Sequence, residues 1–411
     1  MKIKLILLFN FFIRPLVYFT PVPNIISLML IPYLTFRGII ISNKNLYLGI
    51  FLYLFLILNL FSCFINNVSI LNGLINYMIV CFPFFLKIII DENNFNFNYY
   101  RETENLLIIL LLINNTVSIF QFLLLNNQDK VQGLFIGQGM GHHINGALNF
   151  FFAIYIISKL NQKFKKTNLF LVLYSFLITF MSDTKSIIFA FLCSIFVYLF
   201  LKLILAIIDK NKKIHFQNIL TTIFYLIGSI VFTYIFLKFF VNLRHINLDY
   251  FLYGFSHKYS LYSQIFPNFF DLLFGYGPGM TTSKLAFMAN FFERYDFLEN
   301  FYYTFSNLSQ YIFFDYQYQN YLTNPTTGSS LFQVNFTFGG ILGDLGLIGI
   351  FLYLILFFML FKIRLNNFLE TIFIIQILFL GLYFTWLEEV FFMVPLIIIF
   401  KLLQISLLEE K

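Results

Sequence analysis

Charged residues are scarce in this chain. Only 11% of its 411 residues are Asp, Glu, Lys or Arg, whereas about 25% are charged in an ordinary soluble domain. This scarcity excludes an ordinary soluble enzyme and a disordered chain. It also excludes a nucleic-acid binder, because the 26 Lys and Arg residues lie singly along apolar stretches and form no basic patch.

Cysteine is scarce too. Cys63, Cys81 and Cys193 all lie inside apolar runs, so neither a disulfide nor a metal site is indicated. No cluster of His, Asp and Glu has the spacing of metal ligands, and we expect neither a metal nor another cofactor. The apolar run after Lys2 and Lys4 leads to no small-residue cleavage site, which predicts a retained first helix rather than a removed signal peptide.

Continuous apolar sequence is abundant. Hydrophobic residues make up 60% of the chain, in runs of about 16–26 residues, long enough for membrane-spanning helices. A barrel would instead alternate apolar and polar residues. The sequence therefore predicts an all-α, polytopic transmembrane protein. The first two spans are short and form either a helical hairpin or one broken span. We count about twelve candidates: 4–19, 24–36, 46–64, 70–90, 105–126, 143–158, 168–182, 186–208, 217–242, 332–361, 368–386 and 388–405.

The basic residues of the short loops predict the orientation. With the N-terminus inside, the outer short loops contain only Lys130 and Lys185, so both termini are expected in the cytoplasm. Three regions follow: a membrane bundle at 1–242, a large outer loop with short helices at 243–331, and C-terminal spans at 332–411. The inner loops contain Arg37, Lys44, Arg101, Lys159, Lys163, Lys165, Lys166, Lys210, Lys212, Lys213, Lys362 and Arg364.

Lys130 and Lys185 therefore lie outside against the general bias. They favour an anionic partner there, although each follows or nearly follows an aspartate and could simply pair with it. A glycine cluster leads to His142 and His143 at the start of a span. A histidine there is either a general base near pH 7 or an interfacial side chain bonded to backbone or water.

The large loop contains a glycine-rich turn and many tyrosines. Gly275, Gly277 and Gly279 predict a tight turn that lets backbone approach a ligand or another helix. Basic residues flank it, namely Lys258, Lys284 and Arg294. The tyrosines form either an interfacial belt or a platform on which sugar rings stack.

Asp344 lies in a glycine-rich, otherwise apolar segment that opens the tenth span. Glycines at this spacing usually indicate close helix packing. A carboxylate in apolar surroundings is costly, so we expect Asp344 to face a polar cavity or a cation.

The order of these motifs resembles the superfamily of O-antigen polymerases (Wzy) and O-antigen ligases. Its members often have an Arg-x-x-Gly-x-Phe stretch, to which 130–135 (KVQGLF) is similar, and a Ser-Arg-Gly-like turn, to which 183–186 (DTKS) is similar. Lys258 takes the place of an arginine about seventeen residues before the Gly-x-Gly at Gly275, and 344–349 (DLGLIG) is similar to an E-x-G-x-x-G helix start.

The departures from the family pattern are consistent. Lysine stands in three arginine places, which keeps the charge but loses the bidentate fork for phosphate. The ligase branch usually has a His-Asn pair before the acidic residue, whereas this chain has Asn335 there and no histidine from 258 onward. The resemblance covers about residues 125–360 and favours the polymerase branch.

The resemblance implies a GT-C-like membrane glycosyltransferase of the bacterial inner membrane. Its substrate would be a glycan on undecaprenyl pyrophosphate, with membrane lipid, a chain-length regulator and a flippase as further partners. The reaction needs positive charge to stabilise the leaving pyrophosphate, a role that we expect of Lys130, Lys185, Lys258 and Arg294. It also benefits from a base near the attacking hydroxyl, for which His143 and Asp344 are the candidates. The alternatives are an O-antigen ligase and a polysaccharide flippase or other transporter, the latter disfavoured by the single long outer loop.

Overall fold

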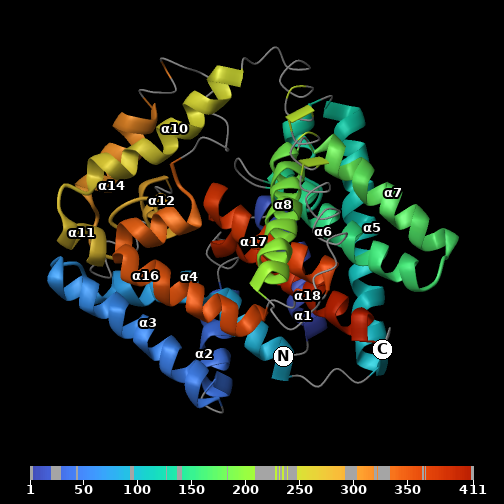
Figure 1. The fold of residues 1–411 in the computed structure, drawn as a ribbon, viewed down its shortest axis with the longest axis horizontal. Coiled ribbons are helices and arrows are strands. Elements are labelled where there is room, and N and C mark those ends of the chain that lie inside the picture. Colours follow the sequence, from blue (N-terminus) through green and yellow to red (C-terminus); the bar gives the residue numbers. More distant parts are fainter. Residues whose placement is uncertain are drawn as a thin grey trace.

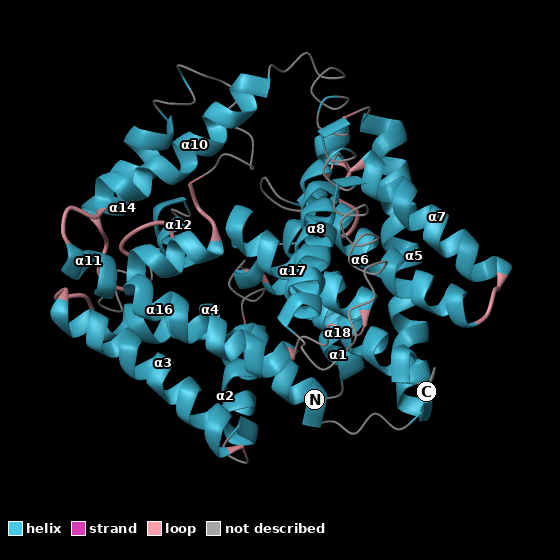
Figure 2. Cartoon of the chain, in the orientation of Figure 1, coloured by secondary structure: helices cyan, strands magenta, loops and turns pink. Residues whose placement is uncertain are grey.

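The computed structural model describes most of the chain. The described residues are 3–19, 29–42, 45–92, 97–125, 127–136, 141–182, 184–208, 248–291, 303–318, 334–362 and 367–408, with the isolated positions 227, 228, 231, 234, 235, 238, 322 and 365. Within these ranges the regular structure is helical and no strand occurs (Figure 2). The all-α prediction is confirmed for this part of the chain.

Six of the described helices are long and apolar enough to cross a membrane. The protein is therefore a helical membrane protein. The six are α3 (Leu46–Ile65), α4 (Ile70–Glu92), α5 (Phe97–Leu125), α8 (Lys185–Ile208), α16 (Thr337–Phe361) and α18 (Val390–Leu408).

Five further helices accompany them. Three are apolar but shorter: α2 (Leu30–Ser42), α7 (Lys166–Met181) and α17 (Phe368–Tyr383). The other two are α1 (Ile3–Phe19) and α6 (Gly141–Gln162). The count of twelve spans stays a prediction, as does the GT-C-like fold, and the expected span at 217–242 lies almost wholly outside the described residues.

Short polar turns join these helices into antiparallel pairs. Asn45 begins α3 by accepting a hydrogen bond from the Leu48 N–H at 3.3 Å, and Asn66 ends it by donating to the Ser62 carbonyl at 2.9 Å. Helices α4 and α18 are mostly buried and lie centrally, with α3 and α7 toward the outside (Figure 1).

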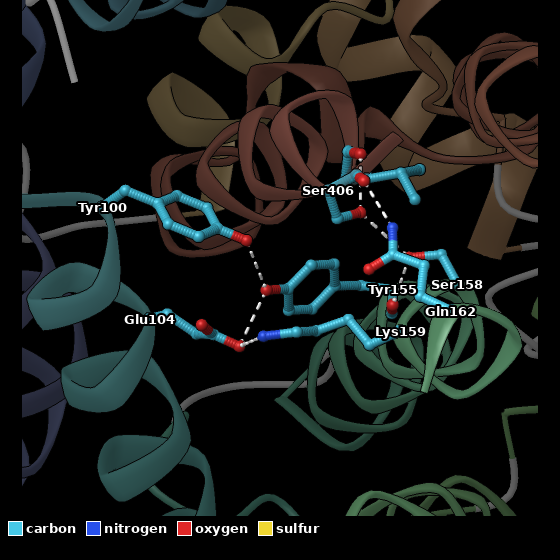
Figure 3. A network of polar contacts seen from close by, with 8 residues as sticks. Tyr100, Glu104, Tyr155, Ser158, Lys159, Gln162 and Ser406 are labelled. Carbon is cyan, nitrogen blue, oxygen red and sulfur yellow. Dashed lines mark hydrogen bonds and ion pairs between the residues drawn. The ribbon is translucent and has the colours of Figure 1, made fainter. Parts of the chain in front are cut away.

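One end of the bundle is fastened by a charged and hydroxyl-rich network (Figure 3). Glu104 on α5 accepts from the Tyr155 hydroxyl on α6 at 2.8 Å and pairs with Lys159 one turn further along α6. Ser158 lies 3.1 Å from Ser406 near the end of α18, oxygen to oxygen. This is the end at which the sequence places the inner loops.

Between α8 and α16, the described residues 248–291 and 303–318 form short helices. They are α10 (Leu248–Ile265), α11 (Phe269–Phe274), α12 (Lys284–Phe291), α14 (Asn307–Gln310) and the π-helix η4 (Tyr311–Gln317). Two hydrogen bonds from α10 reach the end of α17, from Lys258 and Tyr259 to the carbonyls of Tyr383 and Leu382. The other end of α17, at Glu370, contacts Gln404, which lies two positions before Ser406 of the network in Figure 3. The segment therefore packs on the opposite end of the bundle.

Candidate functional site

The turn between α17 and α18 is buried and acidic. After Tyr383 the chain is extended at Phe384, makes one 3-10 turn, η6 (Thr385–Glu388), and enters α18 at Val390. Residues 384–389, here called the acidic turn, include the adjacent carboxylates Glu388 and Glu389. Glu388 is only 3% exposed, so both its charge state and its partners have large energetic consequences.

Glu389 is held by cations from two other helices. Its Oε2 lies 2.8 Å from Nζ of Lys284 on α12, and the guanidinium of Arg14 on α1 lies nearby, 4.3 Å from the centre of the Phe391 ring. Burial acts to raise the pKa of Glu389, but the charges of Lys284 and Arg14 outweigh it and lower the pKa. Glu389 is therefore a structural anion at neutral pH.

The surroundings of Glu388 instead favour its neutral, protonated form. Its Oε2 accepts the backbone N–H of Lys284 at 3.0 Å, while its Oε1 is buried without a hydrogen-bond partner among the described residues. Burial raises the pKa of Glu388 to about 8. Neighbouring carboxyl groups whose pKa values are pushed apart are a common property of acid–base sites.

Aromatic rings cover the same turn. Trp386, the single tryptophan of the chain, stacks on Phe384 with ring centres 4.2 Å apart and planes 10° from parallel. The ring of His143, in the first turn of α6, lies 6.0 Å from Phe384 and 6.1 Å from Trp386. The indole Nε1 of Trp386 is buried with no partner in the described part of the chain.

Lys258 reaches the start of this turn from α10. Its Nζ donates to the Tyr383 carbonyl at 2.6 Å and lies 4.7 Å from the centre of the Phe336 ring. The side chain is fully buried, and burial lowers the pKa of Lys258 to about 7. The sequence predicts Lys258 as a cation of the site, and the structure places it beside the acidic turn.

The segments of the other two predicted lysines meet at His142. Lys130 is exposed and ends the 3-10 turn η2 (Gln128–Lys130). Its neighbour Asp129 has an Oδ1 3.8 Å from the His142 Nε2. Thr184, directly before Lys185, donates from its hydroxyl to the His142 carbonyl at 3.4 Å. The structure thus brings these segments together, while the side chains of Lys185 and Arg294 lie outside the described residues.

A buried amide network holds the segment of Lys130 in place. The Asn145 amide on α6 donates to the Val131 carbonyl at 3.1 Å and to Ser182 at 3.2 Å. Asn114 on α5 donates to Asn145 at 2.6 Å. Sequence reasoning did not find this network, although asparagines inside apolar helices are a visible signal for it.

Asp344 faces a protein loop, contrary to expectation. Its carboxylate accepts the N–H groups of Gly279 at 2.6 Å and Thr281 at 3.1 Å, and the Thr281 hydroxyl at 2.7 Å. Among the described residues, these donors lie where we expected a polar cavity or a cation. Asp344 therefore fastens the glycine loop, residues 275–279, to α16.

The glycines of that loop are required by close backbone contact. Gly275 has φ of 71° and Gly346, at a kink in α16, has φ of 68°. A Cβ on Gly275 would lie 2.5 Å from the Asp344 carbonyl carbon, and one on Gly346 would lie 2.5 Å from the Phe274 nitrogen. The predicted close approach is to another helix.

Sequence reasoning missed Trp386, Glu388 and Glu389. Two adjacent carboxylates between the last two apolar runs, next to the only tryptophan, are the signal that could have identified them. Within the described ranges, no three His, Cys, Asp or Glu side chains are grouped as a metal site requires.

The fold and site define a helical membrane protein with a buried acidic turn facing cationic and aromatic side chains. No family model, no curated protein and no solved structure matches the chain.

Proposed function

We propose that this protein is an inner-membrane glycosyltransferase that elongates a surface polysaccharide, of O-antigen or capsule type, from repeat units on undecaprenyl pyrophosphate. The order of the sequence motifs supports this assignment. The structural observation that carries it is the meeting of the Lys130, Lys185 and Lys258 segments around His142, His143 and the acidic turn.

The reaction needs positive charge beside the leaving pyrophosphate and a base beside the attacking hydroxyl. A hydroxyl of the acceptor repeat unit attacks the anomeric carbon of the donor, and the bond from that carbon to the pyrophosphate oxygen breaks with its electron pair leaving on the pyrophosphate. Cations stabilise that developing charge, a role we assign to Lys130, Lys185, Lys258 and Arg294. No metal enters this scheme.

The two bases predicted from the sequence differ in their surroundings. His143 lies against the rings of the acidic turn, where it can orient an acceptor sugar or take a proton. Asp344 already accepts three hydrogen bonds from the glycine-loop segment, which favours a positioning role for it.

The orientation belongs to the same proposal. The network end of the bundle would face the cytoplasm together with both termini, and the acidic turn and α10–α14 would face the outer side. The lipid-linked repeat unit would arrive there from a flippase, and a chain-length regulator would act on the growing polymer.

Deletion of the gene, complemented by the unchanged gene on a plasmid, tests the proposal on a polysaccharide gel. A polymerase leaves single repeat units but no ladder. Polymer that remains unattached to its acceptor would indicate a ligase, and lipid-linked units trapped on the cytoplasmic side would indicate a flippase. An unchanged ladder would refute all three.

A further inference from the structure

Three buried polar atoms without partners in the described ranges lie on adjoining segments. They are Nε1 of Trp386, Oε1 of Glu388 and Oδ1 of Asn335. Asn335 precedes Thr337, whose N–H donates to the Phe384 carbonyl at 3.0 Å. A buried polar atom without a hydrogen bond costs about 1–3 kcal/mol, and folded proteins rarely retain such atoms without a reason.

These atoms match the chemistry of a sugar. An indole N–H donor, a carboxyl group and an amide carbonyl complement sugar hydroxyls, which both donate and accept. The buried rings of Phe384 and Trp386 form an apolar, polarisable wall beside these atoms. Pockets for polar ligands commonly combine aromatic walls with a few such polar groups.

We infer that the acidic turn is the subsite for the acceptor sugar and that Glu388 takes the proton from its attacking hydroxyl. This inference rests on the proposed function, because it assumes that a glycan acceptor enters the site. Glu389 is unsuited to the same task, since it pairs with Lys284, and Asp344 is committed to the glycine loop.

The step balances as follows. The hydroxyl oxygen forms a bond to the anomeric carbon while its O–H bond breaks, and the proton passes to Oε1 of Glu388. The carbon–oxygen bond to pyrophosphate breaks at the same time, and its electron pair leaves with the lipid pyrophosphate. Glu388 becomes a neutral acid and returns the proton to solvent before the next turnover.

Charged and titratable groups face Glu388 from several helices. Lys284 on α12 favours its ionised form, whereas Asp344 on α16 disfavours it; Tyr262 on α10 and Tyr353 on α16 also interact with Glu388 electrostatically. Burial dominates and raises the pKa of Glu388 to about 8. A base with a pKa close to the working pH is efficient, and its ionised fraction grows as the pH rises.

The single tryptophan allows binding to be measured directly. The probe is the repeat-unit oligosaccharide released by mild acid from the lipid-linked units that accumulate in the deletion strain. Titrated into the purified full-length protein in detergent, it should change the Trp386 emission saturably, with excitation at wavelengths that tyrosine does not absorb. Absence of a saturable change overturns the acceptor subsite, and this measurement needs no variant.

Turnover tests the proton transfer. Glu388→Gln keeps the shape and hydrogen-bonding capacity of the side chain, so we expect oligosaccharide affinity within about threefold and elongation slower by about 10²–10⁴-fold, as for loss of a general base. The rise of rate with pH should disappear in Glu388→Gln and persist in Glu388→Asp. Elongation by Glu388→Gln at the parental rate overturns the role of Glu388.

Glu370→Gln is the matched control. Glu370 is a glutamate on α17 that is equally buried, at 2% exposure, but it lies at the far end of that helix and contacts Gln404; its variant should elongate at the parental rate. If gene deletion leaves the ladder intact, the proposed function fails. If deletion abolishes the ladder and Glu388→Gln restores it fully, only the inference about Glu388 fails.

Discussion

At the scale of single residues, Lys258 has an unusual environment for a lysine. The amine is fully buried against the Tyr383 carbonyl and the Phe336 ring, and burial lowers the pKa of Lys258 to about 7. Its charge is present below that pH and lost above it, whereas an exposed lysine stays charged to about pH 10. An anionic ligand would stabilise the charged form and hold the proton.

Lys258→Arg should therefore remove a pH dependence. If the amine binds the pyrophosphate of the donor, the KM for donor in the unchanged protein should rise by about 10–100-fold as the pH increases from 6 to 9, because a charge-assisted bond of about 1.5–3 kcal/mol is lost. Arginine stays charged throughout, so the variant should show a flat KM. Lys202→Arg on α8 is the control and should show the same pH profile of KM as the unchanged protein. If Lys258→Arg also shows that profile, Lys258 does not bind the pyrophosphate.

Residue partners are the part of the site that the sequence could not show. The sequence predicted that Asp344 needs a polar partner, because a carboxylate in apolar surroundings is unfavourable. Its partners are backbone groups of Gly279 and Thr281, more than sixty positions away along the chain. Likewise, the sequence predicted Lys258 as a cation of the large loop, but not its burial, which depends on contact with the end of α17. Pairing at such separations depends on tertiary packing, which residue patterns do not encode locally.

At the scale of elements, the contact between the glycine loop and α16 joins the segment from α10 to η4 to the bundle. The N–H groups of Tyr276 and Gly277 donate to the Gly343 and Asp344 carbonyls at 2.9 and 3.0 Å. The kink at Gly346 leaves room for the end of α11. This contact requires glycine both in the loop, at Gly275, and in α16, at Gly346.

Gly346→Ala should destabilise the protein. A side chain at its positive φ is strained by about 1–3 kcal/mol, and its Cβ would meet the backbone of α11. We expect a lower melting temperature in detergent and a reduced yield of folded protein. Gly228→Ala is the control, because a Cβ there meets nothing within 4 Å; equal melting temperatures for the two variants would contradict this account of the contact.

The network of Figure 3 should contribute more to the free energy of unfolding than a surface ion pair does. Glu104→Ala leaves Lys159 and the Tyr155 hydroxyl without their shared acceptor, which should cost about 1–3 kcal/mol. Glu102→Ala on the same helix removes the pair with Lys4, in which the glutamate side chain is 61% exposed, and should cost at most about 1 kcal/mol. Thermal unfolding of the two variants, compared in one detergent, measures the difference.

Apolar runs predicted several elements closely and others less well. The runs at 46–64 and 70–90 correspond to α3 and α4, because polar residues at the turn between them cannot enter the apolar core. The run at 24–36 corresponds to a helix that continues to Ser42. Helix α5 begins eight residues before the predicted 105, because Tyr100 and Glu104 find polar partners on α6, which the sequence could not reveal.

At the scale of the whole molecule, the two ends of the bundle differ chemically. One end carries Lys159 and the pairs of Lys87 and Lys401 with Asp91. The other carries the acidic turn and helices α10–α14. This asymmetry accords with the orientation that the loop lysines and arginines predict.

Cysteine labelling of intact cells or spheroplasts should resolve the orientation. Tyr311→Cys on η4 and Phe164→Cys between α6 and α7 introduce thiols at exposed positions, 47% and 67% exposed in the native residues. A membrane-impermeant reagent should modify position 311 and leave 164 unmodified until the membrane is opened. A Cys193→Ser background removes the one native thiol that is not fully buried. The reverse pattern would exclude an outer-facing site.

The contacts of the segment from α10 to η4 also impose an order on biosynthesis. Gly275 and Gly277 meet α16, Lys258 binds the end of α17, and Lys284 binds both glutamates of the acidic turn. Every one of these partners is translated after the segment itself. When the ribosome has completed residues 248–318, this segment can already contact the α3–α4 turn, where Asn72 donates to the carbonyls of Pro278 and Thr304, but α16 and the acidic turn do not yet exist. Only when the final helical hairpin is made does the segment gain its contacts with the end of α17 and the acidic turn, so the last tenth of the polypeptide completes the packing of the region before it.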